Sequence, residues 1–230
     1  MVHRNSITIS RQFGCGGAKV GQLVASQMGF YYADRKVLHA AAESLGITAE
    51  NVASQSDRIK SFWEKIGALF AHNLNETPYT APPLRPVTDE RLFDLEGRII
   101  RELADREDCV VVGRAGVHVL RDYPGSVHVF LHAPEKFRAM RIMDIYGIPT
   151  EAKSLAMIRE SDRARQEYLN RMARYDWIHA THYHIVLDTS TIPFEQAAKL
   201  IINYIYLKTG RRSCYPIESE SVDNSMEAKG

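Results

Sequence analysis

Short apolar runs alternate with helical patterns along most of this chain. Runs rich in β-branched and aromatic residues predict strands at residues 7–9, 30–32, 109–112, 127–131 and 183–187. Helical spacing of apolar residues follows the first run, at Val20, Leu23 and Val24, and helices are also predicted over residues 35–45 and 194–207. The alternation predicts an α/β fold in which helices cover a mostly parallel sheet. In such folds ligands bind beyond the carboxyl ends of the strands.

Two segments interrupt this alternation. The first, at about residues 54–95, has no strand pattern; helical spacing over 58–72 gives way to a proline-rich stretch, which predicts a mobile insertion able to cover a substrate. The second, at about residues 134–175, is rich in arginine at helical spacing. We expect one domain over residues 1–208 and a polar, serine-rich, disordered tail over 209–230.

The composition narrows the class of protein only slightly. Of the 230 residues 45% are hydrophobic and 25% charged, and the formal net charge of +1 gives no general argument for nucleic-acid or membrane partners. Three cysteines, Cys15, Cys109 and Cys214, lie far apart in sequence, which favours a reducing compartment without structural disulfides. The first residues hold no apolar run long enough for a signal peptide or a membrane span, so we expect a cytoplasmic protein.

A glycine-rich segment lies between the first predicted strand and the first predicted helix. Gly14, Gly16 and Gly17 allow this loop to turn tightly and to point backbone N–H groups at an anion, which the helix dipole also favours. The same glycines are compatible with a purely structural turn. Cys15 is either a reactive thiol near a helix N-terminus or a small residue that fills the turn. The position between strand and helix favours a phosphate cradle formed by Ser10, Arg11, Gly14, Cys15, Gly16, Gly17 and Ala18.

Three segments of the chain together resemble the cytidylate kinase-like family. They are Ile7-Thr8-Ile9-Ser10-Arg11-Gln12-Phe13-Gly14-Cys15-Gly16-Gly17, Val111-Val112-Gly113-Arg114 and Phe130-Leu131-His132-Ala133-Pro134. The resemblance runs over residues 7–205 and rests on the combination of the segments. It implies a three-layer P-loop NTPase fold with a helical acceptor-site insertion and an Arg-rich helical lid. It also implies ATP and Mg²⁺ as cofactors, small-molecule nucleotides as partners, and transfer of the ATP γ-phosphate to CMP or dCMP.

The glycine loop departs from the P-loop pattern GxxxxGK[ST] at the lysine and hydroxyl positions, which contact the phosphates and Mg²⁺. Gly16 matches the second glycine, but Arg11 stands at the first, and Gly17 and Ala18 replace the lysine and the hydroxyl residue. The lysine normally neutralises the β- and γ-phosphates and the hydroxyl ligates Mg²⁺, so both functions depend on other residues. Lys19 is expected to point about 200° away from position 17 around the helix. Arg11, whose planar fork can bridge phosphate oxygens, is the predicted replacement for the lysine.

An arginine at the end of another predicted strand marks the acceptor side. Gly113 and Arg114 directly follow the strand at 109–112, which places a guanidinium at a carboxyl strand end. In the resembled family a Gly-Arg at this point binds the phosphate of the acceptor nucleotide, so Arg114 is predicted to do so here. The alternative is a surface ion pair with Asp108 or Glu107.

Two neighbouring positions bear on the acceptor's identity. The family often has an aspartate after this arginine, but this chain has Ala115, which weakens the inference of cytidine specificity. Asp34 matches an acceptor-side position of the resembled enzymes. It is predicted to contact a sugar or a metal, or to cap a helix beginning at Arg35.

The arginine-rich segment supplies further candidates for phosphate binding. Arg138 and Arg141 lie three residues apart on one helix face, so they are predicted to converge on one phosphate chain. Asp162-x-x-Arg165 resembles the D-x-x-R of cytidylate kinase lids, and Arg159 precedes it. A closing lid would bring these arginines over the γ-phosphate, neutralise charge and exclude water. Ordinary helix-surface ion pairs are the alternative, although the excess of arginine over lysine favours bidentate recognition.

Three functional interpretations remain open. The first is a nucleoside monophosphate kinase, which relies on positioning and charge stabilisation and needs no general base. Its predicted catalytic residues are Arg11, Arg141 and Arg165; Arg138 joins the ATP-binding set, and the substrate-binding residues are Asp34, Arg114, Arg159, Asp162 and Arg165. The second is a nucleotide-binding regulatory protein without turnover. The third is a kinase for another small-molecule acceptor. No metal held by protein side chains is predicted, because His179, His182 and His184 have no suitably spaced cysteine or acidic partner.

Overall fold

A five-stranded sheet forms the centre of the computed structural model, which describes residues 4–34, 90–113, 116–174 and 176–210. The strand order is β2-β3-β1-β4-β5, and each neighbouring pair runs parallel. The strands are β1 (Ser6–Arg11), β2 (Tyr31–Ala33), β3 (Cys109–Val112), β4 (Ser126–His132) and β5 (Ile185–Asp188). The predicted α/β fold with a mostly parallel sheet is confirmed, and every predicted strand overlaps an observed one.

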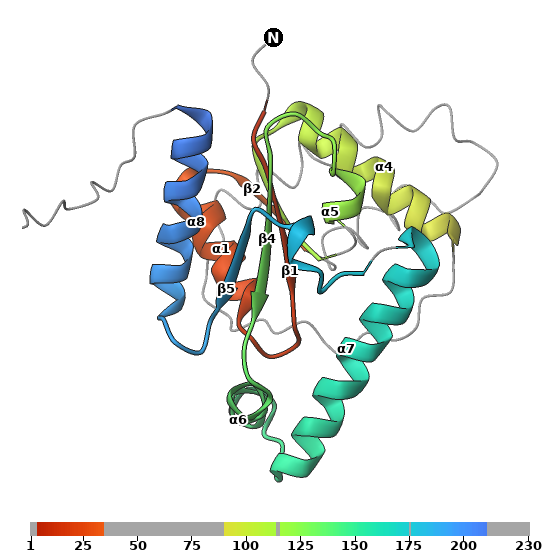
Figure 1. Ribbon diagram of the computed structural model, residues 1–230, viewed down its shortest axis with the longest axis vertical. Helices are drawn as coiled ribbons and strands as arrows, with labels where there is room; N and C mark the ends of the chain where they lie inside the picture. Colours follow the sequence, from red (N-terminus) through yellow and green to blue (C-terminus); the bar gives the residue numbers. More distant parts are fainter. Residues whose placement is uncertain (1–3, 35–89, 114–115, 175, 211–230) are drawn as a thin grey trace, which may run out of the picture.

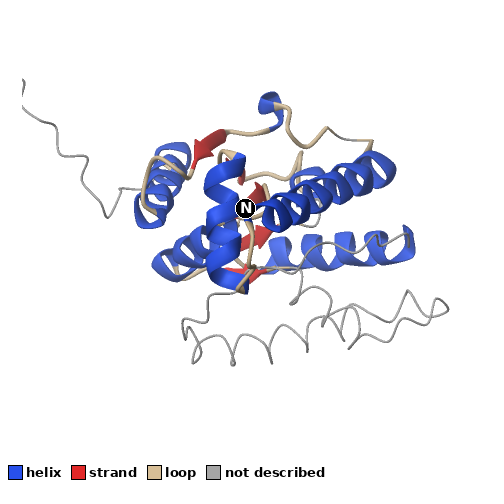
Figure 2. Cartoon of the chain, turned by 90° about the horizontal axis from the view of Figure 1, so that it is seen from below, coloured by secondary structure: helices blue, strands red, loops and turns tan. Residues whose placement is uncertain are grey.

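Helices cover both faces of this sheet (Figure 1). They are α1 (Gly17–Met28), α4 (Glu90–Arg106), α5 (Gly116–Val119), α6 (Glu135–Tyr146), α7 (Glu151–Ala173) and α8 (Phe194–Thr209), with a short 3₁₀ turn η1 (Ala180–His182). Helices α1 and α8 pack together on one face, whereas α4 and α5 lie on the other. Figure 2, seen from below, shows the strands enclosed between these helices.

The central strands β1, β3 and β4 are buried on both faces because successive side chains point alternately to opposite, helix-covered faces of the sheet. Ile9 and Val112 point into the core beneath α1 and α8, where they meet Ile201. Val111 points the other way, into the core beneath α4, where it meets Ile99. This explains the continuous apolar run of β3, which a sheet with one solvated face would not require.

Helix α4 was not predicted from the sequence. It begins at Glu90, inside the predicted insertion at 54–95, and its buried residues form the second core with β3. The helices predicted over 35–45 and 58–72, the proline-rich stretch and the tail beyond residue 210 lie outside the described residues.

The arginine-rich segment forms a helical hairpin, α6 and α7, at the carboxyl end of the sheet (Figure 1). The Ser154 hydroxyl on α7 donates to the Ala139 carbonyl on α6 at 2.8 Å, and Ile142 packs against Ile158 between the two helices. Phe13 from the glycine loop packs into the same apolar cluster. The hairpin is therefore joined to the loop by core packing.

The sheet topology fixes where a ligand belongs. Helix α1, which follows β1, lies on one face of the sheet, and α5, which follows β3, lies on the other, so the chain leaves the carboxyl ends of these neighbouring strands towards opposite faces. A crevice outside the carboxyl ends of two such strands is the usual ligand site of an open parallel sheet. The glycine loop after β1 and Gly113 after β3 border this crevice. In the part of the chain that the structure describes, no helix is both long and apolar enough to cross a membrane.

Candidate functional site

The glycine loop joins β1 to α1 and adopts the left-handed conformation twice, at Gly14 (φ 88°) and Gly16 (φ 85°). Gly16 also needs to lack a side chain, since a Cβ there would lie 2.4 Å from the ring of Phe194. The loop is tied to β4, because the Gln12 N–H donates to the Leu131 carbonyl at 3.0 Å. It presents its outer side to a pocket lined by Arg11, Gln12, Phe13, Gly14, Gly16, Gly17, Ala18, Lys19, Arg141 and Arg165.

The pocket brings together most of the residues predicted to bind ATP, and it adds three that were not. Gln12, Phe13 and Lys19 also line it. Lys19 lies in the first turn of α1, where each Cα–Cβ bond tilts towards the helix N-terminus, so the side chain reaches back to the loop. A rotation of about 200° around the helix axis therefore does not exclude Lys19 from the pocket, contrary to the expectation.

Arg11, the last residue of β1, is buried to 9% exposure. Its stem passes over Gly17, and its Nη1 lies against Gly113 at the end of β3. Among the described residues no hydrogen-bond acceptor is found for this guanidinium, although it lines the pocket. A buried cation with unused donors is costly unless an anion binds it.

Arg165 on α7 also reaches the pocket, and the protein holds it on two sides. Its Nη1 donates to Asp162 Oδ1 at 3.1 Å, and its guanidinium lies 5.2 Å from the centre of the Trp177 ring. Burial lowers the pKa of Arg165 to about 10, and the nearby positive charge of Arg11 contributes to the same shift. Two guanidinium groups close enough to depress a pKa mark a place where negative charge is favourable.

Arg141 on α6 approaches the pocket from the opposite helix of the hairpin. Its guanidinium lies 4.7 Å from the centre of the Phe194 ring, and its buried Nε has no hydrogen-bond partner within the described ranges. Burial lowers the pKa of this side chain. Arg141 thus combines a stacked, fixed guanidinium with unused hydrogen-bonding capacity.

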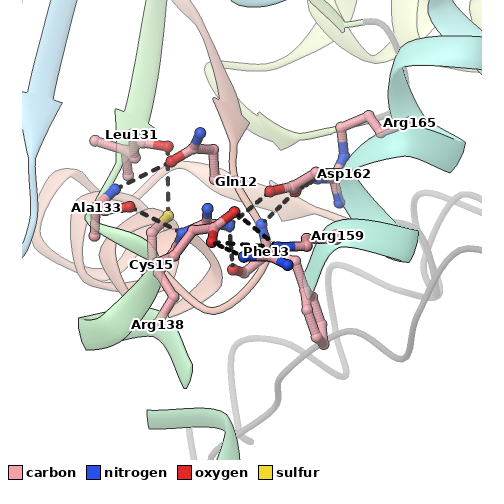
Figure 3. A network of polar contacts seen from close by, with 10 residues as sticks. Gln12, Phe13, Cys15, Leu131, Ala133, Arg138, Arg159, Asp162 and Arg165 are labelled. Carbon is pink, nitrogen blue, oxygen red and sulfur yellow. Dashed lines mark hydrogen bonds and ion pairs between the residues drawn. The ribbon is translucent and has the colours of Figure 1, made fainter. Parts of the chain in front are cut away.

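Arg138 does not converge with Arg141 on the pocket as predicted. It is buried to 3% exposure, and its guanidinium donates to the carbonyls of Ala133 (2.9 Å) and Phe13 (3.1 Å) and to Asp162 Oδ2 (2.6 Å). Figure 3 shows these contacts. The two arginines share a helix face, but Arg138 lies on the part that meets the loop. Its role is to hold the loop backbone against α6.

Asp162 is the centre of this network rather than an exposed ligand of a substrate (Figure 3). Its Oδ1 accepts the Phe13 N–H at 2.9 Å and Arg165 Nη1, and its Oδ2 accepts Arg138 Nη1. One carboxylate therefore links the glycine loop, α6 and α7. Its contacts support a positioning role, and the substrate contact of Asp162 stays a prediction.

Arg159 lies on the surface of α7 and does not line the pocket. Its Nη2 pairs with Glu135 Oε2 at 2.9 Å, and both side chains are largely exposed. The hydrogen bonds from Arg159 lower the pKa of the Glu135 carboxyl. This ion pair joins α7 to the start of α6, as the helix-surface alternative expects, and the substrate contact of Arg159 stays a prediction.

Cys15 contributes its backbone to the loop, while its side chain packs inward. The thiol is fully buried, its Sγ lies 3.4 Å from the Leu131 carbonyl oxygen, and burial raises its pKa. Thr189, after β5, donates its hydroxyl to the Cys15 carbonyl at 2.7 Å. The geometry favours a residue that fills the turn over a reactive thiolate. Ser10 lies behind the loop on β1.

The acceptor side is only partly described. Asp34 directly follows β2 and is 4% exposed, and the Tyr32 hydroxyl lies 3.5 Å from its Oδ2. Its position at a carboxyl strand end next to β3 agrees with an acceptor-side location. Arg114 and Ala115 lie outside the described residues, as does the helix that Asp34 was predicted to cap.

The histidines singled out in the sequence have structural partners. His184 Nδ1 accepts the backbone N–H of His128 at 2.9 Å, and His182 Nδ1 lies 2.9 Å from the Asp176 carbonyl oxygen. Across the described part of the chain, no group of three or more His, Cys, Asp and Glu side chains is placed to hold a metal ion. Trp177 is buried against Phe130.

Comparison with known proteins adds the family. A crystal structure of an uncharacterized protein from Eubacterium ventriosum ATCC 27560 shares the fold, with TM-score 0.65, 22% identity and coverage of 88% of this chain and 98% of that chain. A gluconokinase from Sinorhizobium meliloti 1021 gives TM-score 0.49 and 17% identity over 90% of this chain and 98% of that one.

A curated relative matches part of the chain. A uronate isomerase from Corynebacterium glutamicum is 25% identical over 118 residues, which are 51% of this chain and 21% of that protein. The chain therefore spans about a fifth of that relative's length. The family match is far longer, since it covers residues 6–191. The chain belongs to the cytidylate kinase-like family.

Proposed function

We propose that this protein is a phosphotransferase that transfers the γ-phosphate of ATP to a small phosphorylated acceptor of the CMP or dCMP class. One observation carries the proposal: the buried Arg11, which has no hydrogen-bond partner among the described residues, lines the same pocket as the glycine loop. Arg141 and Arg165 line it too. Such a concentration of positive charge around loop N–H groups suits a polyphosphate chain.

Some residues of the site would contact the phosphates, and others would hold those contacting residues in place. The loop backbone from Arg11 to Ala18 would cradle the phosphates. Arg11, Arg141 and Arg165 would neutralise the charge that develops on the transferred group, because preorganised donors stabilise such charge most effectively. Asp162 and Arg138 would keep the loop and the hairpin in register.

Mg²⁺, which the family resemblance implies, has no assembled protein site in the described residues. Ala18 stands at the hydroxyl position of the P-loop pattern, and no carboxylate lines the pocket. The arginines therefore carry the charge neutralisation that this proposal requires, and no step is assigned to a protein-bound metal.

The acceptor would lie across the crevice, beyond the end of β3. Arg114 is proposed to bind its phosphate, and Asp34 to contact its sugar, since both residues follow strands that end at this crevice. Ala115 leaves the base undetermined, so a kinase for another small acceptor is the second form of the proposal. The loss of the loop lysine and hydroxyl supports a third, nucleotide binding without turnover.

An ADP-release assay with Mg-ATP separates these forms. CMP, dCMP, UMP and AMP would be tested as acceptors, alongside the shift in melting temperature caused by each ligand. Turnover with CMP or dCMP supports the proposal, and thermal stabilisation by ATP without turnover of any acceptor supports the regulatory form. An absence of any effect of ATP contradicts all three forms.

A matched pair of variants tests the site itself. Arg165→Ala is expected to lower kcat/KM at least about a hundredfold, because it removes a preorganised cation. Arg163→Ala is the control, since Arg163 lies two residues away on the same helix and pairs with Glu167 in solvent. Equal activities of the two variants would contradict the assignment of Arg165.

A further inference from the structure

The path of the Arg11 side chain depends on two glycines from different parts of the chain. An ideal Cβ at Gly17 would lie 2.7 Å from Arg11 Cβ and 2.9 Å from its Cγ. An ideal Cβ at Gly113 would lie 2.2 Å from Arg11 Nη1. Side chains at these positions would occupy the same space as the arginine. The stem runs where a side chain at position 17 would start, and the guanidinium ends against β3.

Position 17 is where the P-loop pattern places its lysine. Because Arg11 fills the space next to this position from Cβ to Cδ, an arginine at 11 and a long side chain at 17 are mutually exclusive in this conformation. The two departures from the P-loop pattern are therefore coupled sterically: an arginine at position 11 requires a glycine at position 17. The guanidinium also lies further across the crevice, at the strand end that precedes Arg114.

We propose that Arg11 takes the place of the P-loop lysine at the γ-phosphate, and that Gly17 and Gly113 are positioning residues that keep its path open. The inference rests on the proposed function, which it deepens by assigning one cation to the transferred group. The planar guanidinium contacts oxygens of the transferred phosphoryl group from the acceptor side of the crevice. A lysine at position 17 would instead approach that group from the glycine loop.

The test compares the dissociation constants of ATP and ADP by calorimetry, because a cation at the γ-phosphate affects ATP far more than ADP. Arg11→Gly is expected to weaken ATP binding about tenfold to one hundredfold and ADP binding much less. Arg11→Lys, which keeps the charge without the fork, should retain part of the preference for ATP. An unchanged ratio of the two constants in Arg11→Gly overturns the inference.

The second part of the test exchanges the residues. Gly17→Lys alone should lower the melting temperature, because its side chain meets the rigid base of Arg11. The double variant R11G/G17K, which restores the glycine and lysine of the P-loop pattern, should regain both the melting temperature and the preference for ATP. A double variant no better than the worse single variant overturns the inference.

Gly113 offers a matched control for backbone strain. Gly113→Ala places a methyl group on the flexible end of Arg11, and Gly29→Ala puts the same substitution at φ 67° with nothing within 4 Å. Gly113→Ala should reduce the ATP preference as Arg11→Gly does, and should add nothing in the Arg11→Gly background. Gly29→Ala should leave the preference unchanged.

The remaining outcomes are equally decisive. Equal loss of the ATP preference in Gly113→Ala and Gly29→Ala overturns the positioning role. A wild-type chain that fails to bind ATP contradicts the proposed function and this inference together. Wild-type binding of ATP with an unchanged preference in Arg11→Gly removes the inference and leaves the proposed function standing.

Discussion

At the carboxyl end of the sheet Arg11 is buried without a hydrogen-bond partner among the described residues, whereas in the amino-terminal half His128 is buried with both ring nitrogens engaged. His128 Nδ1 lies 2.8 Å from the Thr8 hydroxyl oxygen, and its Nε2 lies 3.5 Å from the Arg121 carbonyl oxygen. His184 accepts its backbone N–H. Both side chains are less than a tenth exposed.

This difference in hydrogen-bond partners distinguishes a candidate ligand-binding site from a structural part of the core. Buried polar groups are normally paired, so unused donors at one end of the sheet indicate a partner that comes from outside the chain. The ring nitrogens and backbone N–H of His128 are satisfied within the chain, so this residue contributes to stability and to specificity of packing. Arg11 and His128 are buried to a similar extent, and only their hydrogen-bond partners distinguish a binding role from a structural one.

The largest expected effect comes from breaking the carboxyl-end network at its carboxylate. Asp162→Ala should lower the free energy of unfolding by about 3 kcal/mol, because it leaves buried Arg138 and Arg165 without their shared partner. Urea unfolding measures this loss. Added inorganic triphosphate should restore part of it by binding the uncovered arginines. A variant as stable as the wild type would show that Asp162 does not hold the network together.

The free energy of unfolding should decrease in acid because of His128, which lies in the amino-terminal half of β4. Burial lowers the pKa of His128 to about 4 from its usual 6.5, and the facing His184, Lys208 and Arg121 add to the shift. Between these values the unfolded chain binds a proton that the folded chain refuses, so stability is complete above about pH 6.5 and falls as the pH drops towards 4. The loss amounts to about 3 kcal/mol. An NMR titration that places the His128 ring near pH 6.5 would refute this.

A smaller effect, on ATP affinity, is expected when the Trp177 ring next to the Arg165 guanidinium is replaced. Trp177→Leu should weaken ATP binding about fivefold, because a cation–π contact of about 1 kcal/mol is lost from the guanidinium. Trp177→Phe keeps an aromatic face and should lose less. Calorimetry with both variants gives the comparison, and identical losses would argue that the ring only fills space.

The smallest effect is expected at the surface of the hairpin. Glu135→Ala removes the partner of Arg159, but both side chains are exposed and screened by solvent. The melting temperature should change far less than in Asp162→Ala, and any change should vanish in high salt. A large, salt-resistant loss would mean that the exposed pair, rather than the buried one, holds α7 to α6.

The strands were predictable because their signal is local. Residues 109–112 form an uninterrupted apolar run, and such a run fits a strand buried between two layers of helices. Helix α4 was not predicted although its signal is also local: Ile99, Ile100 and Leu103 recur at the spacing of an amphipathic helix, and charged residues occupy the positions between them. The glycine loop was predictable as well, since glycines between a strand and a helix have few other uses.

The roles of single arginines were not predictable to the same degree. Helical spacing correctly indicated that Arg138 and Arg141 share a face, but it does not say which of them meets the loop. Arg138 holds the carbonyl oxygen of Phe13, and Arg159 holds the carboxylate of Glu135. Both outcomes depend on contacts between residues far apart in sequence, for which spacing carries no information.

The sequence by itself determined the alternation of strands and helices, the glycine loop and the absence of a lysine at position 17, because these are properties of residue type and spacing. Only the tertiary structure decided that Arg11 fills the space beside Gly17 and reaches Gly113. The reason is geometric: β1 and β3 are neighbours in the sheet but lie about a hundred residues apart in the chain. Their adjacency, which brings the arginine and the second glycine together, arises when the sheet forms.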